Sequence, residues 1–238
     1  WARRQAVSHP SVSQLNRDLL SELMGGCDSF WLRLDSGLRT GREPRGDGAL
    51  LWGLPALEEA FSGLRPDLAA IQVDAGGNVL PFAELLSRWL KSAGFSLSDC
   101  ALQWSADPLG GLASDGVLPR GADAAYAEGA ALLKWAAAEM PRGRALGLSV
   151  LPYHQAGADS VTELALMTST LAEYLRRYGL HGISPGEVAS QLQITLPVGR
   201  NLFDGISKLR AARRLVQAIF SLSGGGGPVP LHAVTSPR

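Results

Sequence analysis

Tyr153 and His154 are adjacent residues whose side chains could do chemistry together. They follow an apolar run at residues 146–151, which is typical of a buried strand, and small residues follow them at 156–158. Parallel α/β folds bind their ligands beyond the carboxyl ends of such strands. At that position an imidazole can donate a hydrogen bond to a carbonyl group or exchange a proton. The alternative interpretation is a partly buried Tyr–His pair whose polar atoms are satisfied by backbone groups.

Two other predicted strands carry polar residues that could contact a ligand. Gln103 and Ser105 lie on one of them, and Asp107 begins an Asp-Pro-Leu-Gly sequence just after it. These residues could belong to a substrate-binding loop, although an Asx-capped Pro-Gly turn explains Asp107 equally well. His232 lies on the last predicted strand, where it could bind a ligand or have a structural role.

A cluster of basic residues falls on a predicted helix near the C-terminus: Lys208, Arg210, Arg213 and Arg214. Phosphate binding is one interpretation, but a solvated helix face with cations toward its C-terminal half is the simpler one. The glycine run at 224–227 lacks the Lys-Ser/Thr of a P-loop and predicts a linker. We find no zinc-ligand spacing, nucleophile elbow or Ser-His-Asp order, so no metal site is predicted.

Alternating strands and helices must position these residues. We expect strands at 29–34, 69–74, 100–105, 146–151, 191–196 and 231–235, and helices at 15–24, 55–64, 82–93, 123–140, 160–179 and 202–220. Residues 1–8 could form a further strand, while 35–48 and 106–121 are expected to be loops. Ser160 and Glu163 have the spacing of a capping box at the start of a helix.

This alternation predicts an α/β fold with a parallel sheet and right-handed crossovers. No G-x-G-x-x-G sequence follows an early strand, which disfavours a Rossmann sheet. A (β/α)8 TIM-type barrel that is incomplete at its C-terminal end fits better. Residues 1–8 would supply one strand and another would follow Arg238, so residues 1–238 would form a single barrel domain.

The composition argues against several classes of partner. Lys plus Arg and Asp plus Glu both number 22, giving a net charge of zero, which disfavours nucleic acid and anionic membranes. No apolar run reaches the roughly 18 residues of a membrane span, and no signal peptide is visible. Cys27 and Cys100 lack metal-ligand spacing and are expected to be buried thiols in a reducing compartment. We therefore expect a cytoplasmic protein.

Two longer motifs carry a family resemblance. One is Tyr-His-Gln-Ala-Gly-Ala at 153–158, leading into Glu-Leu-Ala at 163–165 and Tyr-Leu-Arg at 174–176. The other is Lys-Leu-Arg-Ala-Ala-Arg at 208–213, with weaker matches at 107–110 and 232–236. Together they resemble the methylmalonyl-CoA mutase family of adenosylcobalamin-dependent acyl-CoA mutases. The resemblance implies a barrel whose centre takes the pantetheine arm of CoA, and a separate domain that binds cobalamin.

The resemblance also implies roles for individual residues. Tyr153 would lie against the cofactor, and His154 would donate a hydrogen bond to the thioester carbonyl of the substrate. These two are the candidate catalytic residues. His232, together with Gln103 and Ser105, would contact the substrate.

Several positions depart from the pattern of catalytic subunits. Gln191 stands where an arginine meets the CoA ester, and Gln193 replaces a small hydroxyl residue. Asp115 lies about where another arginine grips the substrate carboxylate. Loss of such an arginine removes about 2–5 kcal/mol of charge-assisted binding. The cobalamin-binding Asp-x-His-x-x-Gly signature is absent from this sequence.

These departures place the chain nearest to the small, non-catalytic subunit of such mutases, with Tyr153 and His154 as vestiges. Such a subunit would pair with a cobalamin-binding large subunit and stabilise it. Adenosylcobalamin would then be bound mainly by another chain or domain, and this chain alone would bind none. One alternative is an active acyl-CoA mutase barrel that receives adenosylcobalamin from another chain. A second is an acyl-CoA thioester sensor without chemistry.

Overall fold

A parallel sheet of seven strands forms the centre of the molecule. The computed structural model describes residues 1–236 of the 238-residue chain. The strands are β1 (Arg4–Val7), β2 (Ser29–Arg33), β3 (Ala70–Asp74), β4 (Leu102–Ala106), β5 (Arg144–Ser149), β6 (Leu192–Val198) and β7 (Leu231–Thr235). They lie in sequence order, and each pairs in parallel with the next. The expected parallel α/β fold is confirmed, and residues 1–8 do contribute a strand.

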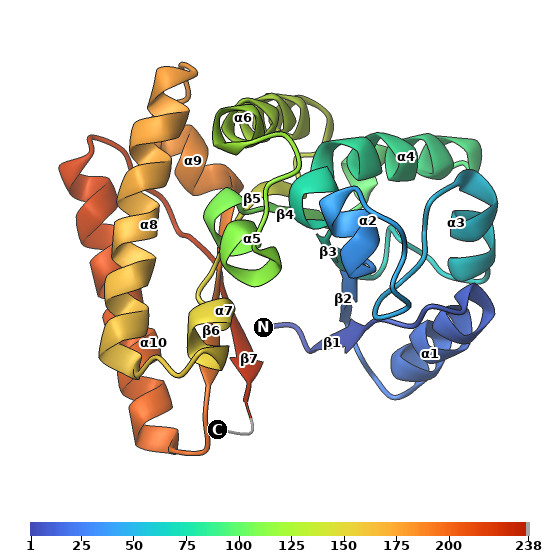
Figure 1. Ribbon diagram of the computed structural model, residues 1–238, viewed down its shortest axis with the longest axis horizontal. Helices are drawn as coiled ribbons and strands as arrows, with labels where there is room; N and C mark the ends of the chain where they lie inside the picture. The colour runs from blue at the N-terminus through green and yellow to red at the C-terminus, as the bar shows by residue number, and fades with distance from the viewer. Residues whose placement is uncertain (237–238) are drawn as a thin grey trace.

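Helices occupy the connections between strands. The longer ones are α1 (Val12–Met24), α3 (Leu54–Ala60), α4 (Val79–Ser92), α6 (Ala122–Glu139), α8 (Ser160–Leu180) and α10 (Leu202–Leu222). Shorter ones are α2 (Ser36–Thr40), α5 (Pro108–Asp115), α7 (Leu151–Gln155) and α9 (Pro185–Gln191), with 3-10 turns at Gly76–Asn78 and Leu97–Asp99. In Figure 1 the long helices form an arc around the outside of the strands, from α1 through α4 and α6 to α8 and α10. Each helix buries one face, as the periodicity predicts.

The sheet is curled, as contacts between side chains of its first strands and its last strands show. Arg4 on β1 lies 3.3 Å from the Gln193 side-chain oxygen on β6. The rings of Trp31 on β2 and His232 on β7 meet edge to face at 5.7 Å. A flat sheet in this strand order would hold these pairs far apart. The curl is consistent with an incomplete TIM-type barrel.

Two of the expected loops contain helices that the sequence analysis missed. The segment 35–48 includes α2, whose N-cap is the fully buried Asp35. That carboxylate accepts hydrogen bonds from four backbone N–H groups, at residues 37, 45, 46 and 47. The segment 106–121 includes α5, with Asp107 as its N-cap. Both helices begin at an aspartate cap, and both are too short to give a periodic signal.

The capping box predicted at Ser160 and Glu163 is wrong. Asp159 is the N-cap of α8 and accepts from the Thr162 N–H at 2.7 Å, while Glu163 turns into the protein interior. A complete capping box occurs instead at the start of α9, between Ser184 and Glu187. The aspartate is the better cap because its carboxylate is charged at the positive end of the helix dipole.

The two cysteines differ in burial. Cys100 is buried, as expected, and burial raises the pKa of its thiol to about 11, whereas Cys27 is only partly buried.

Within residues 1–236, no helix combines the length and apolar character that crossing a bilayer requires.

Candidate functional site

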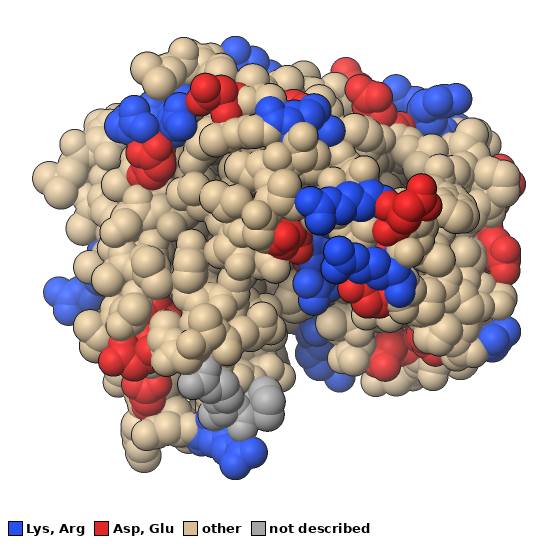
Figure 2. All heavy atoms as spheres, in the orientation of Figure 1, with Lys and Arg blue, Asp and Glu red and all other residues tan. Residues whose placement is uncertain are grey.

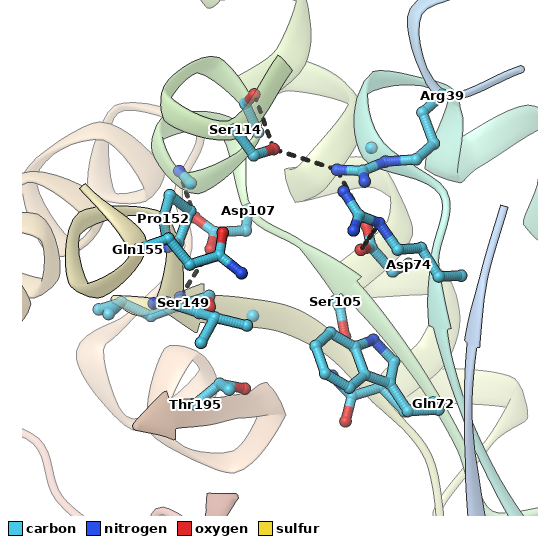
Figure 3. Close-up of a pocket in the computed structure, with 18 residues that line it drawn as sticks. Arg39, Gln72, Asp74, Ser105, Asp107, Ser114, Ser149, Pro152, Gln155 and Thr195 are labelled. Carbon is cyan, nitrogen blue, oxygen red and sulfur yellow. Dashed lines mark hydrogen bonds and ion pairs between the residues drawn. The ribbon is translucent and has the colours of Figure 1, made fainter. Parts of the chain in front are cut away.

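A cleft opens at the carboxyl ends of β2 to β6. Its cavity volume is about 90 Å³, and its walls include Trp31, Arg33, Arg39, Asp74, Ser105, Asp107, Ser149, Gln155 and Thr195. Figure 3 shows Arg39 and Asp74 on one side and Asp107, Ser149 and Gln155 on the other. This is the end of a parallel sheet where α/β proteins bind ligands.

Tyr153 and His154 lie on α7, because β5 ends at Ser149, two residues before the predicted end of that strand. The His154 Nδ1 atom is 2.6 Å from Glu163 Oε1, and its Nε2 atom is 2.8 Å from the Ser236 hydroxyl. Tyr153 is half-buried against the core, and burial raises the pKa of its phenol. The imidazole is therefore fixed from both sides.

Glu163 also forms a buried ion pair with Lys208. The Lys208 Nζ atom is 2.7 Å from Glu163 Oε2, and the two side chains are 3% and 1% exposed. The simpler interpretation of Lys208, on a solvated helix face, is wrong. A signal was present: Lys208 precedes buried Ala212, Val216 and Phe220 at intervals of four, which places it on the inner face of α10.

Asp107 connects α5 to β5 and α8. Its carboxylate accepts from the backbone N–H of Gly110 at 2.9 Å and of Ser149 at 2.7 Å, and from the Tyr174 hydroxyl. Burial raises the pKa of this carboxyl to about 6. The capping interpretation of Asp107 is confirmed, and the same residue lines the cleft.

An ion cluster that the sequence analysis missed forms one wall of the cleft. Arg39 is 3% exposed, and its Nη2 atom lies 2.9 Å from Asp115, 3.4 Å from Asp74 and 3.1 Å from the Ser114 hydroxyl. Arg33 approaches Asp74 at 3.6 Å and is half-exposed. Asp115, which stands about where the resemblance expects an arginine, thus holds an arginine from a different element. Arg39 lay in a predicted loop, so no pattern marked it as buried.

Gln103 and Gln191 bind backbone groups and lie outside the cleft lining. The Gln103 side-chain amide donates to the Leu146 carbonyl at 2.9 Å, where the register between β4 and β5 shifts. Gln191 ends α9 instead of starting a strand, and its side-chain oxygen accepts from the Ala145 N–H at 3.1 Å. Both contacts stabilise the sheet.

Gln193 belongs to a polar network in the interior of the curled sheet. Its side-chain amide donates to the Gln72 oxygen at 3.0 Å, and Arg4 donates to both glutamine oxygens. Arg4 also donates to the Ser29 hydroxyl at 2.8 Å. Burial lowers the pKa of Arg4 to about 10. The network therefore joins β1, β2, β3 and β6 across the interior.

His232 faces the same interior from β7. Burial, and then the charge of Arg4, lower the pKa of its imidazole to about 4. Of the residues that were predicted to contact substrate, only Ser105 lines the cleft.

Figure 2 shows basic and acidic residues side by side around a hollow on the viewed face, with no broad field of one sign. Fold and site together define a parallel α/β protein with polar side chains gathered at the carboxyl ends of its strands. Comparison with known families gives the particular group: the sequence pattern of methylmalonyl-CoA mutase matches residues 1–228. The chain belongs to the methylmalonyl-CoA mutase family.

Individual relatives show which members of the family the chain is similar to. The chain is 33% identical over 241 aligned residues to the methylmalonyl-CoA mutase small subunit of Streptomyces virginiae, covering all of this chain and 36% of that protein. It is 28% identical to a probable methylmalonyl-CoA mutase small subunit of Mycobacterium bovis, over 76% of this chain and 29% of that protein. A methylmalonyl-CoA mutase of Cereibacter sphaeroides is 33% identical over 38% of this chain and 13% of that protein. The chain spans about a third of the length of the small subunits that it matches.

Proposed function

We propose that this chain is the barrel domain of a small, non-catalytic subunit of a methylmalonyl-CoA mutase-type isomerase. It would pair with a cobalamin-binding large subunit and stabilise it in the cytoplasm. In this proposal residues 1–238 form a (β/α)8 barrel that is incomplete at its C-terminal end. The small-subunit relatives support the pairing, because their names imply a large partner.

The observation that carries the non-catalytic role is the polar network in the interior. The family resemblance implies that the pantetheine arm of CoA passes through the centre of the barrel. Here Arg4, Gln72 and Gln193 bridge that centre, and the two glutamines bond to each other at 3.0 Å. A pantetheine arm would have to displace the partly buried guanidinium of Arg4 and break these hydrogen bonds. Desolvated polar groups left unpaired in this way oppose binding.

Family membership implies adenosylcobalamin in the holoenzyme, where it supplies radicals by homolysis of its cobalt–carbon bond. The surroundings of His154 support the proposal that another chain or domain holds it. His154 has both ring nitrogens in hydrogen bonds, to Glu163 and Ser236. We therefore assign the cofactor to another chain or domain and derive no step through it.

One observation favours the alternative of an active acyl-CoA mutase barrel. The His154 ring is fixed by Glu163, which suits an imidazole that must donate to a substrate carbonyl. On this alternative His154→Ala abolishes turnover by the assembled complex, whereas His181→Ala, at an exposed histidine, does not. On the non-catalytic proposal both variants leave turnover unchanged once the complex has assembled.

The proposal is tested by co-expressing the protein with a mutase subunit that carries the Asp-x-His-x-x-Gly signature. We expect the two to co-purify, and we expect calorimetry to detect no binding of methylmalonyl-CoA to this chain alone. Turnover of methylmalonyl-CoA by this chain alone with added cofactor would refute the proposal. Acyl-CoA binding without turnover would support the thioester sensor instead.

A further inference from the structure

Ser236, His154 and Glu163 form a continuous chain of hydrogen-bonded side chains. Ser236 follows β7, and its hydroxyl oxygen lies 2.8 Å from His154 Nε2. On the other side of the ring, His154 Nδ1 lies 2.6 Å from Glu163 Oε1. These are the contacts of a serine nucleophile with its general base, and of that base with the carboxylate that orients it. Spacing along the chain gave no sign of this triad, because 82 residues separate Ser236 from His154.

Glu163 fixes the tautomer of His154 that such a triad requires. Its carboxylate is ion-paired with Lys208 at 2.7 Å, and an ionised carboxylate can only accept hydrogen bonds. The Nδ1 atom of His154 therefore carries the proton and donates to Glu163. This leaves Nε2 free of a proton, so it accepts from the Ser236 hydroxyl. An imidazole in this tautomer can take the proton of a serine that attacks a substrate.

Backbone contacts hold the two ends of the triad in position. The N–H group of Ser236 donates to the Val198 carbonyl at 2.8 Å, which continues the pairing of β7 with β6. The N–H group of His154 donates to the Val150 carbonyl at 3.1 Å at the start of α7. Figure 1 shows α7 beside β6 and β7, where these two anchors meet. The hydroxyl and the imidazole are thus presented by separate elements that are each fixed locally.

A cavity of about 470 Å³ opens at Ser236 and His154. Its volume lies in the range of small-molecule sites. Trp31 and Arg33 line the same cavity. The indole Nε1 atom of Trp31 is buried and has no hydrogen-bond partner within residues 1–236, and Arg33 meets Asp74 at 3.6 Å. N–H donors beside a nucleophile can stabilise the oxyanion that forms when it attacks a carbonyl group.

We propose that Ser236 and His154, with Glu163 as a positioning residue, form an acyl-transfer site that hydrolyses small carboxylic esters. The apolar walls of the cavity, which include Val7 and Leu151, suit a short acyl chain. The activity goes beyond the proposed subunit role and does not depend on subunit pairing.

The reaction has two steps that need only the ester and water. The Ser236 oxygen attacks the carbonyl carbon and passes its proton to His154 Nε2. The bond from that carbon to the alcohol oxygen then breaks, and the departing alcohol takes the proton from His154. Water, deprotonated by His154, next attacks the ester formed on Ser236, which releases the carboxylic acid and restores the serine hydroxyl.

A fluorophosphonate probe tests for the nucleophile, since it phosphonylates serines that a neighbouring base activates and releases fluoride. We expect a single label, which peptide mass spectrometry places on Ser236. Hydrolysis of p-nitrophenyl acetate is expected to show a burst of p-nitrophenol and to stop once the label is in place. An unlabelled protein, or a label on a different serine, would overturn the proposal.

Variants test each member of the triad with p-nitrophenyl acetate. Ser236→Ala is expected to lower kcat/KM at least about 100-fold, whereas Ser207→Ala, at an exposed position on α10, leaves it unchanged. His154→Gln is expected to lose the same factor, and His181→Gln measures catalysis by an exposed imidazole. Glu163→Gln is expected to lower kcat with KM unchanged, a split that a merely structural role would not produce.

Hydrolysis by Ser236→Ala at the wild-type rate would overturn the proposal. Co-purification of Ser236→Ala with the large mutase subunit is expected to match that of the wild type. A failure of the esterase activity is therefore distinguishable from a failure of the proposed pairing.

Discussion

At the scale of single residues, Glu163 on α8 joins the neighbouring helix α7 to the distant helix α10. Its two oxygens contact His154 on α7 and Lys208 on α10. All three residues come from the motifs that carry the family resemblance. Because each is buried and paired, a structural role explains why these residues are present even where no reaction occurs. The motifs therefore indicate the family more directly than they indicate an activity.

The buried pair gives a first prediction. Lys208→Met is expected to lower the free energy of unfolding by about 3–5 kcal/mol, because it leaves the Glu163 carboxylate buried without its cation. The double variant Lys208→Met/Glu163→Gln is expected to lose less, since no uncompensated charge remains. Urea denaturation measures both. Arg210→Met, on the exposed face of the same helix, is expected to stay within about 0.5 kcal/mol of wild type. A double variant as unstable as Lys208→Met would contradict this account.

Two buried titratable groups give opposite pH dependences. The folded-state pKa of Asp107 is raised to about 6, so its contribution to stability is present below about pH 4 and is lost as the pH rises through 6. The folded-state pKa of His232 is lowered to about 4, so its contribution is present above about pH 6.5 and is lost as the pH falls through 4. Each effect amounts to about 3 kcal/mol. Between pH 4 and 6 the two largely cancel.

Replacing the histidine separates these two effects. We expect His232→Leu to show a free energy of unfolding that falls, relative to wild type, by about 3 kcal/mol between pH 4 and 6.5. Denaturation curves across this pH range measure the difference. His181→Leu, at an exposed position, is expected to follow the wild type. A difference between His232→Leu and wild type that does not change with pH would show that His232 titrates normally in the folded state.

At the scale of elements, the sequence predicted six of the seven strands and every long helix, because each has a clear apolar pattern. The strand β1 was only one possibility for residues 1–8, since its four residues carry no such pattern. The short helices α2, α5, α7 and α9 were not predicted, since one or two turns give no period. For the site, the sequence placed Ser105 and Asp107 near the strand ends but not Arg39. Charge pairing between α2 and α5 depends on how distant loops meet, and spacing along the chain carries no information about it.

The contact between β4 and β5 gives a prediction at this scale. Gly147→Ala would place a methyl group 2.9 Å from Ser105 Cα and 3.2 Å from Ser105 C, both backbone atoms that cannot rotate away. We expect a loss of about 1–3 kcal/mol in the free energy of unfolding, measured by urea denaturation. Gly111→Ala, where no atom lies within 4 Å, is expected to be neutral or slightly stabilising. Equal stability of Gly147→Ala and wild type would show that β4 and β5 can separate at no cost.

At the scale of the whole molecule, the curl brings the beginning of the chain against its end. Arg4 and Gln193 are 189 residues apart in sequence and meet inside the sheet. The contact makes the interior polar and bridged, where the family resemblance expects an open path. On the proposed function, a contact between β1 and β6, strands far apart in the sequence, would keep a CoA arm out of the interior.

Arg4 is a partly buried cation whose side-chain hydrogen-bond partners are all neutral: Ser29, Gln72 and Gln193. Its pKa is lowered to about 10 because burial disfavours the charged form. Arg4→Met keeps much of the side-chain length and removes the charge, and the two glutamines can still bond to each other. We therefore expect the free energy of unfolding to stay unchanged or rise by about 1 kcal/mol, as for other buried charges replaced by apolar groups.

Arg3→Met, at a neighbouring exposed position, controls for the loss of one positive charge. A loss of stability in Arg4→Met alone would mean that the hydrogen bonds of Arg4 outweigh the cost of burying its charge. The interior network would then stabilise the fold as well as close the path.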